Sequence, residues 1–311
     1  MIKVVCVVGA TATGKSALAV RLAKAFDGEI ISGDSAQVYR GMDIGTAKVT
    51  REEMEGVPHH LIDLLDINEG FSAGLFAELG RERARDIAAG GRLPIIAGGT
   101  GLYVDAMTGP ALLSPTADSD PAVREELMAK AEREGAEALH AYLGSIDPAA
   151  AAEIHPNNVK RVARAIEIYL VTGKTKTEHS ATPRAQSEFS RGLILLEHPD
   201  RAELYRRIDR RVDLMMEAGL LSEARRLWEM GLAHTPTASA AIGYKEFFPY
   251  FEGAASLESA VEKVKQASRN YAKRQITYFK RMTDAFPIDL SLGKEAVFER
   301  AREYVRAFLE N

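Results

Sequence analysis

The sequence predicts an α/β protein, with a core of parallel strands and helices that is interrupted by a helical insertion. Two observations support this class. Short apolar runs alternate with segments of helical period over residues 3–97, which is typical of right-handed βαβ units around a parallel sheet. After Gly109 the strands stop, and a helical pattern continues until another apolar run at residues 193–196.

The first part of the core is predicted from β-branched runs and helical spacing. Residues 3–8 predict a buried strand, and the spacing of Leu18, Leu22 and Ala25 predicts a helix at residues 17–26. In chain order, the same criteria predict strands at residues 29–32 and 61–65, a helix at residues 71–89 and a strand at residues 93–97.

A helical insertion domain is assigned to residues 114–188, and residues 1–113 and 189–311 are assigned to the core. Asp120 can cap a helix whose first turn contains Pro121, and Gly173 is a stop signal for a later helix. The core then resumes with a strand at residues 193–196 and long helices at residues 200–228 and 257–282. The first of these helices has an apolar side and carries most of its arginines elsewhere: Arg206, Arg207, Arg210 and Arg211.

Composition limits the class of protein further. The chain has 311 residues, 46% of them hydrophobic, and a single cysteine, Cys6, which excludes an intrachain disulfide framework and a cysteine-cluster metal site. No apolar run approaches the roughly 20 residues of a membrane-spanning helix. We therefore expect a soluble, cytoplasmic protein without a membrane partner that acts as a monomer.

The charge distribution is uneven, although the formal net charge is only −4. Residues 261–281 hold seven Lys or Arg against one Glu. Such a stripe is either a solvated helix face or a surface for nucleic-acid phosphates. Composition alone does not separate these two interpretations.

A glycine-bounded loop between the first strand and helix fits the phosphate-binding pattern G-x-x-x-x-G-K-[ST]. Its backbone amides and the following helix N-terminus favour phosphate oxygens, Lys15 adds a positive charge, and the Ser16 hydroxyl can bind Mg²⁺. The core is therefore expected to be P-loop NTPase-like and to bind a nucleotide or another diphosphate. The loop residues are Gly9, Ala10, Thr11, Ala12, Thr13, Gly14, Lys15 and Ser16.

The carboxylate of Asp34 follows the second predicted strand. Small-molecule and nucleotide kinases can place a carboxylate there to bind the acceptor. On the residues alone, a small-molecule or nucleotide kinase that uses ATP in the same loop is one interpretation.

Residues 34–39, DSAQVY, together with the phosphate loop, resemble the tRNA dimethylallyltransferase (tRNA isopentenyltransferase) family. The resemblance continues in consistent order over residues 3–285. Further matching stretches lie at residues 41–48, 58–63, 98–103, 160–165, 242–246 and 273–279.

The resemblance implies transfer of a dimethylallyl group from dimethylallyl diphosphate to N6 of the adenine just 3′ of a tRNA anticodon, with Mg²⁺ as cofactor. It implies that Asp34 is the general base, that Thr100 assists, and that Arg225 clamps the diphosphate. The adenine has to leave its stack, so we expect a channel that the two reactants enter from opposite ends. Contacts to tRNA, in particular its anticodon stem-loop, are expected from Asp34, Ser35, Ala36, Gln37, Arg124, Lys160, Arg161 and Arg164. A tRNA-binding module without catalysis stays open as an alternative, beside the kinase.

Overall fold

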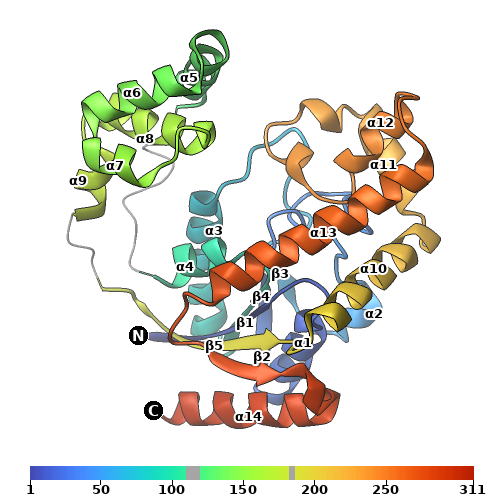
Figure 1. Ribbon diagram of the computed structural model, residues 1–311. Helices are drawn as coiled ribbons and strands as arrows, with labels where there is room; N and C mark the ends of the chain where they lie inside the picture. Colours follow the sequence, from blue (N-terminus) through green and yellow to red (C-terminus); the bar gives the residue numbers. More distant parts are fainter. Residues whose placement is uncertain (110–119, 182–185) are drawn as a thin grey trace. The chain divides into compact units, whose positions relative to one another are not determined.

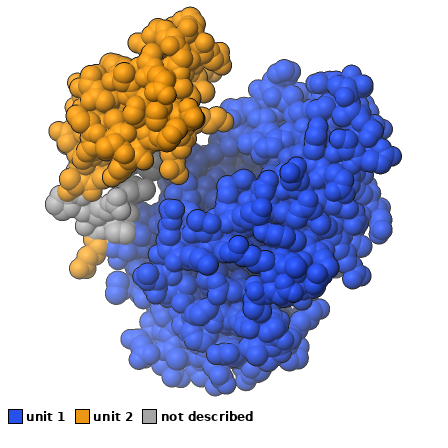
Figure 2. Space-filling view, viewed as in Figure 1, with its two compact units in different colours: residues 1–109, 187–311 blue, residues 110–186 orange. Residues whose placement is uncertain are grey.

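The computed structural model describes residues 1–109, 120–181 and 186–311 (Figure 1). The chain forms two compact units, one of residues 1–109 and 187–311 and the other of residues 110–186 (Figure 2). The predicted boundary at 113/114 lies outside the described residues, and the predicted boundary at 188/189 lies beside the change of unit after Gln186. Within the described residues, no helix combines the length and the apolar character that a bilayer crossing requires.

The larger unit is built on a parallel sheet, as the sequence predicts. β1 lies at its centre, with Val5 opposite Ile95 of β4 and Cys6 opposite Leu193 of β5. In spatial order the strands are β3 (His59–His60), β2 (Gly28–Ser32), β4 (Leu93–Gly98), β1 (Ile2–Gly9), β5 (Phe189–Glu197) and β6 (Phe286–Asp289).

Successive side chains of a strand point to opposite faces of the sheet, so the apolar strands of this sheet have two faces to bury. Helices cover both of them. Cys6 of β1 packs in the core that includes residues of α3, α4, α11 and α13, whereas Val7 packs in the core formed with α1 and α14. The helices of this unit are α1 (Lys15–Ala25), α2 (Arg51–Met54), α3 (Ala73–Ala89), α4 (Gly101–Thr108), α10 (Arg201–Glu217), α11 (Leu220–Glu229), α12 (Phe248–Phe251), α13 (Leu257–Phe279) and α14 (Lys294–Glu310). Short 3₁₀ turns occupy Leu232–His234, Ala238–Ala240, Lys245–Phe247 and Leu290–Leu292.

Three segments of the core differ from the sequence prediction. Residues 61–65 are not a strand, because Leu61 and Asp63 have positive φ angles of 60° and 53°, and the strand there is β3. The helix expected over residues 200–228 is two helices, α10 and α11, which separate at Gly219 with φ 101°. Strand β6 was not predicted, because it is a short edge strand that contains a proline.

The smaller unit is a helical bundle with its own apolar core, which includes Leu139, Leu143 and Ile166. Asp120 caps its first helix, since its carboxylate accepts from the Ala122 and Val123 amides, and Gly173 ends α8 with φ 71°. The helices are α5 (Pro121–Glu134), α6 (Ala136–Ile146), α7 (Pro148–Glu153), α8 (Val159–Thr172) and α9 (Lys176–Ala181).

Candidate functional site

The carboxyl ends of three adjacent parallel strands place the candidate site. β1 leads into the phosphate loop, β2 leads to Asp34, and β4 leads to Thr100. Because β2, β4 and β1 are neighbours in the sheet, these three segments emerge at one edge, where ligands of open α/β sheets usually bind.

The phosphate loop links β1 to α1, as its motif requires. The Lys15 Nζ donates to the Ala10 carbonyl at 2.7 Å, and the Thr13 hydroxyl donates to the same carbonyl at 2.7 Å. Burial and the neighbouring Arg211 guanidinium lower the pKa of Lys15 to about 7, although the Asp34 carboxylate opposes this. A bound anion beside Lys15 would restore its charge, so the loop is suited to an anionic ligand.

Arg211 of α10 is the arginine that reaches the phosphate loop. Its Nη1 lies 3.5 Å from the Thr11 hydroxyl, and burial lowers the pKa of Arg211 while the Asp34 carboxylate raises it. The sequence analysis placed Arg211 with the arginines that lie mostly away from the apolar side of its helix. The available signal was its spacing: it is three residues after Ile208 and four before Met215, both on the inward side.

Arg225, the arginine expected to clamp a diphosphate, has a different environment. It is exposed on α11, and its guanidinium lies over the Phe251 ring at 4.3 Å and near Trp228 at 6.0 Å. It does not line either cavity described below, within the described residues. The structure therefore brings Arg211, not Arg225, to the loop.

Two cavities meet at Asp34. The P-loop cavity, of about 800 Å³, includes Gly14, Lys15 and Ser16 in its wall. The second cavity, of about 220 Å³, includes Ser35 and Ala36. The residues that line both cavities are Thr11, Asp34, Thr46, Arg211, Met215 and Tyr271.

The Asp34 carboxylate is half-buried at this junction. Its Oδ1 accepts a hydrogen bond from the Ala36 amide at 2.9 Å, which fixes the side chain in a turn. Among the described residues, its second oxygen makes no hydrogen bond of good geometry. This oxygen is therefore available to a donor group of a ligand.

Helix α13 contributes Tyr271 and Gln275 to the wall of the P-loop cavity. Gln275, only 4% exposed, accepts from the Thr11 amide at 2.8 Å and donates to the Gly99 carbonyl at 3.0 Å. A Cβ atom at Gly99 would lie 2.1 Å from the Gln275 Nε2, so this position requires glycine. Gln275 thus joins the phosphate loop to the loop that carries Thr100.

Tyr271, one turn before Gln275, faces Thr100. Burial raises the pKa of Tyr271 to about 12, and the Asp34 carboxylate adds to this, whereas hydrogen bonding toward Thr100 and Gln275 lowers it. The Thr100 Oγ1 is buried and, within the described residues, has no partner in ideal geometry. Thr100 itself lines neither cavity within the described residues, but the adjacent Gly99 and the facing Tyr271 line the P-loop cavity. A buried hydroxyl without a full partner at this position is suited to bind a polar ligand atom.

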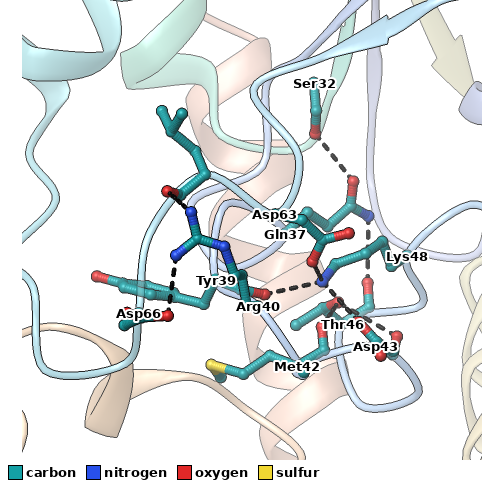
Figure 3. Close-up of polar contacts among 12 residues, drawn as sticks. Ser32, Gln37, Tyr39, Arg40, Met42, Asp43, Thr46, Lys48, Asp63 and Asp66 are labelled. Atoms are coloured by element: carbon teal, nitrogen blue, oxygen red, sulfur yellow. Dashed lines mark hydrogen bonds and ion pairs between the residues drawn. The ribbon is translucent and has the colours of Figure 1, made fainter.

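Gln37, expected to contact tRNA, instead holds the wall of the site (Figure 3). Its Oε1 accepts from the Ser32 hydroxyl at 2.9 Å, and its Nε2 donates to the carbonyls of Thr46 and Ala47, each at 3.3 Å. The side chain is buried, and both ends of its amide are used. Gln37 therefore has a structural role in this chain, and its contact with tRNA stays a prediction.

The same wall is held by a buried lysine (Figure 3). The Lys48 Nζ donates to the Tyr39 carbonyl at 2.8 Å and forms ion pairs with Asp43 at 2.6 Å and Asp63 at 2.5 Å. From behind, the buried Glu223 carboxylate accepts from the amides of residues 43, 44 and 45. These charges hold a loop that lacks regular secondary structure but borders both cavities.

The smaller unit holds the four cations expected to contact tRNA. Lys160 and Arg161 are exposed at the start of α8. Arg124 and Arg164 form ion pairs with Glu167, whose side chain is fully buried, at 2.9 and 3.0 Å. Burial alone would raise the pKa of Glu167, but the hydrogen bonds from Arg164 and Arg124 lower it overall. These two arginines therefore have a structural task within the unit.

The described residues contain no group of three or more His, Cys, Asp or Glu side chains arranged to hold a metal ion. Mg²⁺ does not need such a cage, since it commonly takes one or two protein oxygens and completes its shell with phosphates and water. The exposed hydroxyl of Ser16, in the wall of the P-loop cavity, is compatible with this mode of binding.

The sheet order, the strand–loop–helix at β1 and the cavity around Lys15 define a P-loop-like α/β protein whose phosphate loop lies beside the Asp34 carboxylate. A family model described as IPP transferase matches residues 37–282. A tRNA dimethylallyltransferase of Bacillus subtilis is 48% identical over 301 residues, which is 95% of each chain. The chain belongs to the IPP transferase family.

Solved structures agree with this assignment. The tRNA isopentenylpyrophosphate transferase of Bacillus halodurans is 43% identical, has a TM-score of 0.75, and covers 100% of this chain and 97% of its own. A eukaryotic dimethylallyltransferase that acts on tRNA is 30% identical and has a TM-score of 0.80, with 93% of this chain and 74% of that chain covered. The fold is therefore shared across distant members.

Proposed function

We propose that the protein transfers a dimethylallyl group from dimethylallyl diphosphate to N6 of the adenine just 3′ of a tRNA anticodon and releases diphosphate. The observation that carries this proposal is the meeting of two cavities at Asp34, one lined by Lys15 and Ser16 of the phosphate loop and the other by Ser35 and Ala36. A transfer between a small diphosphate and a tRNA is suited to such an arrangement, because donor and acceptor can reach the same point from different sides.

The donor diphosphate binds in the P-loop cavity. Negative charge accumulates on it as the allylic carbon–oxygen bond breaks, and the loop amides, Lys15 and Arg211 oppose that charge. These groups therefore contribute more in the transition state than in the ground state. Mg²⁺, held by Ser16 and the diphosphate, would supply further charge stabilisation when bound.

The acceptor adenine enters through the second cavity, past Ser35 and Ala36. Its N6 forms a bond to the allylic carbon while the carbon–oxygen bond to diphosphate breaks, and the N6 proton passes to the free oxygen of Asp34. General-base catalysis of this kind contributes about 10²–10⁴-fold. Thr100 donates a hydrogen bond to the diphosphate or orients the base, and its buried hydroxyl next to Tyr271 supports this role.

The tRNA anticodon stem-loop also contacts the smaller unit, through the exposed Lys160 and Arg161. Extruding the adenine costs a few kcal/mol, and this cost is lowest when the base lies in a loop.

The transfer is tested by incubating the protein with Mg²⁺, unmodified tRNA and dimethylallyl diphosphate, and digesting the tRNA to nucleosides. The expected product is an adenosine whose mass has increased by one isoprenyl group. A parallel reaction with ATP in place of the donor tests the kinase alternative, which the family relationship disfavours. Unchanged tRNA together with ATP consumption would reject the transferase proposal.

A further inference from the structure

Helix α10 presents three parallel rows of side chains to the two cavities. Leu214 and Ala218 line only the P-loop cavity, and Ile208 and Val212 line only the second cavity. Between these rows, Arg211 and Met215 line both. The central row therefore runs along the junction where donor and acceptor meet.

Met215 is the sole large apolar side chain among the described residues that border both cavities; the others are Thr11, Asp34, Thr46, Arg211 and Tyr271. It is half-buried, and it follows Arg211 by four residues, which places it one helical turn away on the same face. An anion held by Arg211 would thus have an apolar side chain about 6 Å further along the helix axis.

We propose that Met215 contacts the hydrocarbon tail of the allylic donor and limits its length to five carbons. This inference rests on the proposed function. The reacting carbon has to lie between the phosphate loop and Asp34, so the tail attached to it begins at the junction. Of the side chains there, Met215 provides the apolar surface that a branched hydrocarbon needs.

The size of the second cavity supports a limit on donor length. Its volume of about 220 Å³ lies below the roughly 300–1,000 Å³ of usual small-molecule pockets, and it also has to admit the adenine. A ten-carbon tail would extend past Met215 into the space of the acceptor base. Removing most of the methionine side chain provides room for the longer tail.

The test compares Met215→Ala with Met216→Ala, using dimethylallyl and geranyl diphosphate as donors with the same unmodified tRNA. Met216 is the same residue type on the same helix, is also half-buried, and lines neither cavity among the described residues. We expect M215A to raise the ratio of kcat/KM for geranyl over dimethylallyl diphosphate by about 10-fold or more, the usual effect of a pocket-size change. M216A should keep the wild-type ratio.

A second variant, Met215→Phe, tests the proposal in the opposite direction and does not depend on M215A being stable. It should lower transfer from dimethylallyl diphosphate about 10-fold while binding of inorganic diphosphate stays at the wild-type level. Equal donor ratios in M215A and M216A, or full transfer by M215F, would overturn the role of Met215. If the wild-type protein formed no product with dimethylallyl diphosphate and none with geranyl diphosphate, the proposed function would be rejected instead.

Discussion

At the scale of single residues, the site depends on charges that are brought close together without being neutralised. Asp34, Lys15 and Arg211 influence one another, and among them Lys15 has a markedly lowered pKa. Such perturbed groups in a cavity are typical of catalytic and ligand-binding sites. Two predictions concern these residues.

Asp34→Asn should reduce dimethylallyl transfer by about 10²–10⁴-fold, because an amide cannot accept the N6 proton. Binding of Mg²⁺ with inorganic diphosphate should persist, since the phosphate loop is unchanged. Single-turnover kinetics and calorimetry measure these two properties. Asp66→Asn, at an exposed carboxylate paired with Arg40, is the matched control, and equal rates for both variants would contradict the assignment.

The affinity for inorganic diphosphate should decrease as pH rises above about 7. With a pKa of about 7 in the free protein, Lys15 is charged below this pH and neutral above it. The bound anion favours the charged form, so binding above pH 7 takes up a proton, which calorimetry in buffers of different ionisation enthalpy detects. Lys15→Arg keeps its charge at every pH and should lack this uptake; equal proton uptake by both proteins would exclude Lys15 as its source.

At the scale of elements, helix α13 connects parts of the site that are distant in sequence. Gln275 bonds to the phosphate loop and to the loop after β4, while Tyr271 lies beside Thr100. The sequence predicts the helix and its amphipathic character. It does not predict that Gln275, a polar residue on the buried face, joins the phosphate loop to the loop after β4. Helix period identifies the face and carries no information about the partner.

Gln275→Leu should lower the free energy of unfolding by about 1–3 kcal/mol, because the Thr11 amide and the Gly99 carbonyl lose their buried partner. Urea denaturation measures this change. Gln266→Leu, on an exposed position of the same helix, should stay within about 0.5 kcal/mol of the wild type. Similar losses in both variants would show that the bridge contributes little.

At the scale of the whole molecule, the chain separates its tasks between two units. The phosphate loop, Asp34 and Thr100 all belong to the larger unit, and the smaller unit has an independent apolar core. This organisation predicts that tRNA affinity can be changed in the smaller unit without changing diphosphate binding.

The double variant Lys160→Glu, Arg161→Glu should weaken tRNA binding and reduce its salt dependence. The slope of log affinity against log salt concentration should become shallower by about one unit for each phosphate that is no longer neutralised. Arg133→Glu, an exposed cation on α5 of the same unit, is the control for added negative charge. Titrations of tRNA at several salt concentrations measure the slopes, and inorganic diphosphate affinity should be equal in all three proteins. An unchanged slope in the double variant would exclude phosphate binding by these two cations.

Sequence pattern was sufficient to predict the parallel α/β core, the phosphate loop, the helix caps at Asp120 and Gly173, and the family. These features are local, because strand composition, capping and motif spacing involve residues that are close in the chain. The folded arrangement was needed to show that Arg211 rather than Arg225 reaches the phosphate loop. It was also needed to show that the Gln37 amide forms hydrogen bonds within the chain and that two cavities share Asp34. These outcomes depend on packing between segments far apart in sequence, and local periodicity does not specify which of several arginines or amides meets a given partner.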